Sequence, residues 1–165
     1  MFVLAFSSCS KKIAFTSDIQ AKHQFSETTL KKVQFYTSKT IYLYKVSSDQ
    51  QASVNGGKVL LNNNNRTERI IVKKNTPCIV EKVIDEKHFI VSFEYGVGKI
   101  LAFGNNNGGC YSLMAKGWNE DMQGTLVYGG TTYQTNSGGV FLTIKLKKLT
   151  NAQNRERTLK GRKVK

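Results

Sequence analysis

The sequence predicts an all-β domain, a small antiparallel barrel or sandwich of about ten short strands with little helix. Apolar and polar residues alternate with a period of two in many short segments, which is the pattern of a half-buried strand. Turn-forming residues recur between these segments at intervals of roughly 8–12 residues. Fourteen glycines and a single proline suit short strands that are joined by tight turns.

The first segment to be placed is residues 10–29, which show neither a helical nor a strand period and are predicted to form a tether. The β domain is predicted to follow at residues 30–149. Its strands are expected, in chain order, at 33–37, 41–46, 58–61, 69–72, 78–84, 88–94, 99–103, 110–114, 124–128, 131–134 and 140–146. A helical turn is expected around Trp118.

Turn residues separate these strands. Ser38-Lys39 predicts a hairpin between the first two strands, and Asp85-Glu86-Lys87 predicts another. The four asparagines 62–65 favour a turn because their side chains compete for backbone hydrogen bonds and tolerate left-handed conformations. Gly129-Gly130 supplies the positive φ that a two-residue hairpin turn needs.

The alternation also predicts the core. Strand lengths of roughly five to seven residues favour a small barrel that resembles the SH3-like barrels. The residues expected to be mostly buried are Val33, Phe35, Ile41, Leu43, Val80, Phe89, Val91, Phe93, Leu101, Phe103, Leu126 and Leu142. If Phe93 is in the core, Phe93→Ala is expected to cost about 3–5 kcal/mol of stability.

The first twelve residues carry a family resemblance. An apolar run is followed by Phe6, the small residues Ser7 and Ser8, then Cys9 and a lysine-containing segment. This pattern resembles the end of a bacterial lipoprotein signal, and Phe-Ser-Ser-Cys followed by lysines is similar to lipoproteins of the Bacteroidetes group. The resemblance implies that residues 1–9 end a signal and that Cys9 is diacylated.

The same resemblance implies a place in the cell. A protein acylated at Cys9 would be an outer-membrane lipoprotein, and Ser10-Lys11-Lys12 lacks the acidic run associated with surface export, so we expect it to face the periplasm. The apolar stretch Phe2–Phe6 is shorter than the roughly 7–15 residues of a signal core, so we expect the true start upstream of Met1. The alternative is a cytosolic protein in which Cys9 belongs to a first strand.

Most of the net charge of +14 lies near the end of the chain. Residues 145–165 carry nine Lys and Arg against Glu156 alone, whereas the predicted domain is nearly balanced. A charge block of this kind predicts a solvated extension, here residues 150–165, that contacts anionic lipid head groups or lipopolysaccharide phosphates. Nucleic acid would attract the same tail. The contact residues are expected to be Arg155, Arg157, Lys160, Arg162, Lys163 and Lys165.

The other two cysteines, Cys78 and Cys110, form an even pair that an oxidising compartment would allow to join as a disulfide. Two buried free thiols are the alternative, because cysteine packs as a small hydrophobe. A cysteine nucleophile needs a histidine base, and only His88 follows Cys78. The histidines and cysteines include no closely spaced ligand pair, so neither a metal site nor another cofactor is expected.

The segment Gly108–Ser112, around Cys110, bears a slight resemblance to the nucleophile motif of the L,D-transpeptidases. That motif has a serine two residues before the cysteine and an arginine two residues after it, where this chain has Gly108 and Ser112. We therefore expect a structural role for Cys110 and no catalytic residue in the chain.

Aromatic residues are the stronger functional signal. Aromatic platforms bind sugars or extended peptides by stacking, although tyrosines in sheets also form half-buried cross-strand pairs. The candidates for ligand stacking are Tyr111, Trp118, Tyr128 and Tyr133. The function expected from the sequence is a lipid-anchored binding, scaffold or accessory domain of the cell envelope, with an envelope protein or glycan as its partner. The alternatives are an envelope hydrolase or transpeptidase acting on peptidoglycan or glycans, and a basic nucleic-acid-binding barrel.

Overall fold

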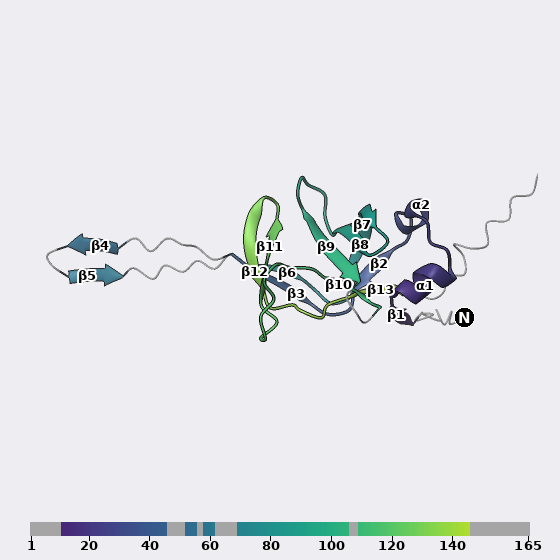
Figure 1. Cartoon of the computed structure of the whole chain (residues 1–165). Helices are drawn as coiled ribbons and strands as arrows, with labels where there is room; N and C mark the ends of the chain where they lie inside the picture. Colours follow the sequence, from purple (N-terminus) through teal and green to yellow (C-terminus); the bar gives the residue numbers. More distant parts are fainter. Residues whose placement is uncertain (1–10, 46–51, 56–57, 62–68, 106–108, 146–165) are drawn as a thin grey trace, which may run out of the picture.

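The computed structural model describes residues 11–45, 52–55, 58–61, 69–105 and 109–145. It confirms the all-β class (Figure 1). The two antiparallel sheets are not closed into a barrel, which is consistent with a sandwich, so the small SH3-like barrel favoured by the strand lengths is wrong. Within the described ranges, no helix is long and apolar enough to cross a membrane.

Seven strands form the larger sheet. In spatial order they are β1 (Lys12–Ala14), β13 (Leu142–Lys145), β2 (Phe35–Thr37), β7 (Pro77–Asp85), β8 (His88–Ser92), β9 (Ile100–Asn105) and β10 (Tyr111–Leu113). The second sheet is β11 (Gly124–Tyr128), β12 (Thr131–Thr135), β3 (Ile41–Tyr44) and β6 (Arg69–Val72). Strands β4 (Ala52–Asn55) and β5 (Lys58–Leu61) pair with each other.

The period-two pattern accounts for these strands locally. Along β11, buried and exposed residues alternate without exception, so one face of the strand packs inward and the other meets solvent. Gly129 and Gly130 join β11 to β12 with φ values of 57° and 78°, the two positive angles that were expected for this hairpin. Around Trp118 the chain forms turns, including one between Asn119 and Met122, where a helical turn was expected.

The hairpin predicted at Ser38-Lys39 is wrong, because the two strands beside it lie in different sheets. β2 pairs with β13 and β7, whereas β3 pairs with β12 and β6. Ser-Lys does not supply the two positive φ angles of a tight hairpin. Ser38 instead exchanges hydrogen bonds with Phe141, its backbone N–H donating to the Phe141 carbonyl at 2.9 Å and its hydroxyl accepting from the Phe141 N–H at 2.9 Å. The chain thus crosses between the sheets here.

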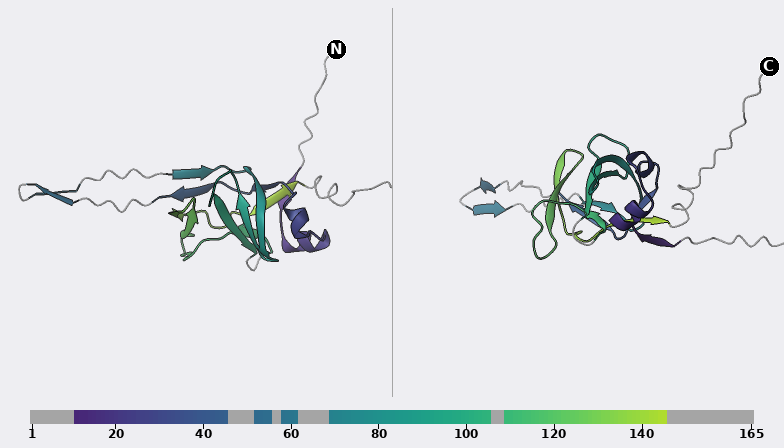
Figure 2. Two further views of the ribbon diagram at one scale, coloured as in Figure 1. Left: turned by 90° about the horizontal axis from the view of Figure 1, so that it is seen from above. Right: turned by 45° about the vertical axis from the view of Figure 1, so that its right-hand side comes forward.

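The tether predicted for residues 10–29 is also wrong over most of its length. Lys12–Ala14 form β1, and the segment continues into two short helices, α1 (Ser17–Lys22) and α2 (Glu27–Leu30). Both helices lie beside the larger sheet at one end of the molecule (Figures 1 and 2). Phe15 is fully buried, and Phe25 and Leu30 are nearly so, because this segment closes one side of the core.

The predicted core is largely confirmed. Eleven of its twelve residues are buried, and the exception is Phe93, which is half-buried where β8 ends. The loss of about 3–5 kcal/mol expected for Phe93→Ala was conditional on full burial, so a smaller loss is now expected. The core also contains residues from the N-terminal segment, chiefly Phe15, whose ring lies 5.0 Å from that of Phe35.

Candidate ligand pocket

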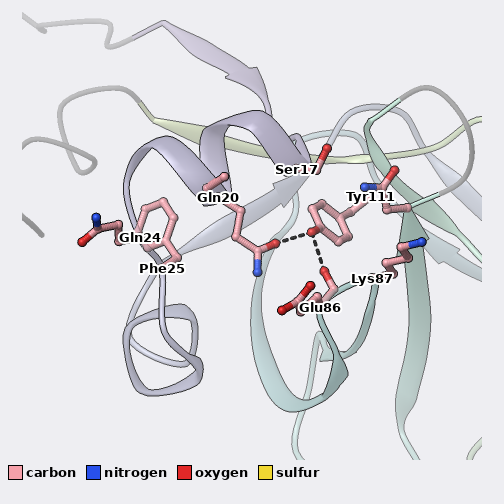
Figure 3. A pocket seen from close by; sticks show the side chains of 9 residues that line it. Ser17, Gln20, Gln24, Phe25, Glu86, Lys87 and Tyr111 are labelled. Carbon is pink, nitrogen blue, oxygen red and sulfur yellow. Dashed lines mark hydrogen bonds between the residues drawn. The ribbon is translucent and has the colours of Figure 1, made fainter.

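A pocket of about 410 Å³ lies between α1 and the turn that joins β7 to β8 (Figure 3). We call it the α1 pocket. It is lined by residues from four separate parts of the chain, so that only the folded domain brings them together. The lining residues are Ser17, Gln20, Ala21, Gln24, Phe25, Glu86, Lys87, Asn105 and Tyr111.

The sequence fixes α1 at both ends. At its start, the Thr16 hydroxyl accepts a hydrogen bond from the Ile19 N–H at 3.2 Å, which is the geometry of an N-cap. The Ser17 N–H donates to the Gly109 carbonyl at 2.8 Å and joins the helix to the segment that precedes β10. At its end, Gln24 has a φ of 47°, which ends the helix and turns Phe25 into the core.

Helical spacing explains which α1 side chains line the pocket. Within α1, Gln20 and Ala21 follow Ser17 by three and four residues, so these three side chains lie on one face of the helix. Gln24 lines the pocket from just beyond the end of α1, where its φ is 47°. Figure 3 shows the Gln20 side chain directed toward the Tyr111 hydroxyl. The polar face of α1 therefore forms one wall of the pocket.

Tyr111 forms the floor. Only 1% of this residue is exposed, and its ring stacks on Phe89 and Phe15 with centroids at 4.3 Å and 5.2 Å. Its hydroxyl contacts the Gln20 side chain and the Glu86 carbonyl, the latter at 2.8 Å. Burial first, and then the neighbouring carboxylates, raise the pKa of Tyr111 to about 12, so the phenol keeps its proton at neutral pH.

The Tyr111 hydroxyl also determines how Gln20 faces the pocket. A phenol has one proton, so it can donate to the Glu86 carbonyl or to Gln20, but not to both at once. In the structure the hydroxyl faces both Gln20 Oε1 and the Glu86 carbonyl, so these two acceptors compete for its proton. Gln20 Oε1 is therefore occupied by Tyr111, and the Gln20 amide nitrogen is the group that can donate to a bound molecule.

The opposite wall is the β7–β8 turn, which carries the exposed side chains of Glu86 and Lys87. Asp85 orders this turn, because its carboxylate accepts from the Lys87 N–H at 2.7 Å and contacts His88 Nδ1 at 2.8 Å. The hydrogen bond to His88, and then that from Lys87, hold the pKa of Asp85 below its usual value. The Asn105 N–H donates to the Lys87 carbonyl at 2.8 Å and joins the turn to β9.

The aromatic residues proposed for ligand stacking do not form a common platform. Tyr111 is buried beneath the α1 pocket and offers its hydroxyl rather than its ring face. Tyr128 and Tyr133 are each 5% exposed and belong to the second sheet, where Tyr128 donates to Glu94 at 2.8 Å. Trp118 is half-buried and packs closely against Gly124. The stacking prediction is therefore wrong for the three tyrosines, whose rings are needed in the core.

Cys78 and Cys110 are both free, so the predicted disulfide is wrong and the alternative of free thiols holds. Cys78 lies on β7 and Cys110 directly precedes β10, three strand positions away in the sheet. Neighbouring strands are about 4.8 Å apart, whereas a disulfide needs Cα atoms within about 7 Å of each other. In the part of the chain that the structure describes, no His, Cys, Asp and Glu cluster could hold a metal ion.

Neither free cysteine has the surroundings of a nucleophile. Cys78 is 2% exposed, and burial raises the pKa of its thiol to about 12, so the reactive thiolate does not form at neutral pH. Cys110 is half-buried, and His88 is occupied with Asp85 instead. These positions suit packing rather than acyl transfer.

Cys78 gives a pH-dependent prediction. The unfolded thiol loses its proton above its ordinary pKa of 9.0, while the folded thiol keeps its proton up to about pH 12, so ionisation lowers stability as the pH rises between these values. We expect the fall in unfolding free energy across this window to be shallower in Cys78→Ala, by at most about 1.4 kcal/mol per pH unit. Urea titrations at several alkaline pH values measure the slope. The half-buried Cys110→Ala is the matched control, and identical slopes in all three proteins would contradict the prediction.

Sequence reasoning missed the α1 side of the pocket because residues 10–29 were assigned to a tether. Two signals were present: Thr16 and Ser26 are good N-cap residues, and each caps a helix in the structure. The predicted acylation site Cys9 and the six predicted tail contacts from Arg155 to Lys165 lie outside the described residues. The chain matches no protein-family model, no curated protein and no solved structure.

Proposed function

We propose that this protein is a lipid-anchored domain of the bacterial cell envelope that binds a glycan in the α1 pocket and carries out no chemistry of its own. The anchor is Cys9, and the domain faces the periplasm from the outer membrane. The observation that carries the binding proposal is the convergence of polar side chains on a pocket whose floor presents the Tyr111 hydroxyl.

The lining chemistry favours a sugar over a purely apolar or strongly charged ligand. The amides of Gln20, Gln24 and Asn105 each combine donors with an acceptor, which matches the hydroxyl and acetamido groups of a sugar residue. Glu86 and Lys87 add one acceptor and one donor of opposite charge. Convergent polar groups of this kind fix the orientation of a ligand in its pocket.

The hydrolase or transpeptidase alternative has less support. It needs an accessible thiolate beside a histidine, whereas Cys78 is buried and protonated and the described histidines make no hydrogen bond to Cys110. A binding domain needs neither group. The nucleic-acid-binding alternative predicts tighter binding to a single-stranded oligonucleotide than to anionic vesicles at the same salt concentration.

Blocking the pocket is the direct test. Ala21 is exposed and lines the pocket, so Ala21→Trp is expected to fill it without disturbing the core. We expect the N-acetylglucosamine disaccharide to shift the side-chain amide NMR signals of Gln20, Gln24 and Asn105 in the full chain. Ala21→Trp should weaken this binding at least tenfold.

Lys22→Trp is the matched control, because Lys22 is the next residue on α1, is exposed and does not line the pocket. It should bind the disaccharide as the unchanged protein does. Equal binding by the Ala21→Trp protein would show that the sugar binds elsewhere. No amide shifts with the disaccharide would contradict the glycan proposal.

A further inference from the structure

Lysine side chains gather around Tyr36 in the larger sheet. The strands that carry them, β1 and β13, lie beside β2 in this sheet (Figure 1). Lys12 and Lys145 are register partners, and their ammonium groups lie 4.0 Å and 5.5 Å from the centre of the Tyr36 ring. Two like charges converge on one aromatic ring, whose faces attract cations through the ring quadrupole. This arrangement concentrates positive charge at one place on the sheet.

The turn before β7 extends this positive surface. The Lys12 ammonium donates to the Asn75 side chain at 2.9 Å, and Asn75 is preceded by the exposed Lys73 and Lys74. Exposed Lys11 directly precedes Lys12. We call this surface the basic strip, and define it as Lys11, Lys12, Tyr36, Lys73, Lys74, Asn75 and Lys145.

The charge of the basic strip is not neutralised within the described residues. The ion pairs there join Lys31 to Glu27, His88 to Asp85 and Lys99 to Glu94, and none includes a lysine of the strip. The five ammonium groups of the strip therefore keep their positive charge, and Lys11, Lys73 and Lys74 are exposed to solvent or to an external anion. Surface charge of one sign attracts an extended anionic partner more strongly than a small one, because many contacts form together.

The course of the chain indicates which anionic partner the strip meets. β1 begins at Lys12 and β13 ends at its partner Lys145, so the segments before and after the domain leave from neighbouring positions on this sheet. Cys9 precedes Lys12 by three residues, which span at most about 11 Å. Residues 146–165, which follow Lys145, carry eight Lys and Arg against Glu156.

We propose that the basic strip docks the domain on the anionic phospholipid head groups of the leaflet that holds the Cys9 lipid. The choice of a membrane rests on the proposed acylation of Cys9, which holds the strip close to the head groups. A lipid chain and a basic surface together give a firmer attachment than one signal alone.

The test uses the full chain with Cys9→Ser, so that the strip is measured without any lipid. Sedimentation with vesicles of phosphatidylcholine containing phosphatidylglycerol gives the affinity. We expect Lys11→Glu/Lys73→Glu/Lys74→Glu to weaken binding at least tenfold. All three side chains are exposed, so the melting temperature should stay close to that of the parent protein. Binding by the parent should also fall steeply with added salt and be absent with phosphatidylcholine alone.

The matched control changes the net charge equally at exposed lysines outside the strip, with Lys22→Glu/Lys32→Glu/Lys82→Glu. The control variant should lose less than threefold in vesicle affinity. When residues 151–165 are removed from both triple variants, the difference in affinity between them should remain. Equal losses in the two variants would overturn the strip proposal and attribute binding to net charge. Tighter binding to a single-stranded oligonucleotide than to the vesicles, at the same salt, would overturn it in favour of nucleic acid. Every protein in this test lacks Cys9. A result that contradicts the strip proposal therefore does not bear on the acylation of Cys9, which a separate labelling experiment tests.

Discussion

Phe15→Ala is expected to lower the free energy of unfolding by about 3–5 kcal/mol, as removal of a buried phenylalanine does in a packed core. Phe15 is fully buried, and its ring lies within 5.0–6.3 Å of the rings of Phe25, Phe35, Phe89 and Tyr111. Alanine would leave a cavity among these rings, which the rigid sheet on one side cannot fill. Urea unfolding followed by circular dichroism measures the loss.

The same experiment tests whether the N-terminal segment belongs to the domain. If residues 10–29 formed a tether, Phe15→Ala would change stability very little. Phe93→Ala is the matched control, because it removes the same atoms from a half-buried position and should cost less than Phe15→Ala. A loss below about 1 kcal/mol for Phe15→Ala, or a larger loss for Phe93→Ala, would contradict the packing described here.

The strands with sustained alternation could be read from the sequence, and β5 and β6 begin and end at the predicted residues. β1 could not be predicted from the sequence, because its three residues span too little of the period-two pattern to distinguish a strand from a loop. Its pairing with β13 joins opposite ends of the domain, and a local pattern carries no information about such partners. The β2–β3 error has the same origin, since the alternation predicts strands but not the sheet that each strand joins.

Of the residues that line the α1 pocket, the sequence predicts one as a binding residue, Tyr111. Tyr111 was selected from the sequence, but the expected role was an exposed ring, whereas the ring is buried and the hydroxyl faces the pocket. A tyrosine can pack its ring in the core and keep its polar tip at a surface, and the sequence alone does not distinguish the two uses. Gln20 and Glu86 become recognisable only when α1 is placed against the β7–β8 turn.

Cys9→Ala is expected to remove the protein from the membrane fraction and to abolish labelling by palmitate. The reason is that the cysteine thiol is the proposed acylation site, and each buried CH₂ of an acyl chain contributes about 0.8 kcal/mol to membrane attachment. The basic strip and the tail would still attract anionic head groups, so both proteins are compared after a high-salt wash, which screens these charges. After this wash, the unchanged protein should stay in the membrane pellet and Cys9→Ala should be in the supernatant.

The measurement uses a Bacteroidetes host, expression from the natural start of the gene, and metabolic labelling followed by fractionation. Cys110→Ala is the control, because it removes a half-buried thiol within the domain and should change neither labelling nor fractionation. Label that persists in Cys9→Ala would place the lipid at another residue. If neither protein carries label and both are in the supernatant, the lipoprotein assignment is rejected in favour of the cytosolic alternative, in which Cys9 belongs to a first strand. Fractionation before and after the high-salt wash separates the contribution of the lipid from that of the lysines, because only the attachment through lysines is screened by salt.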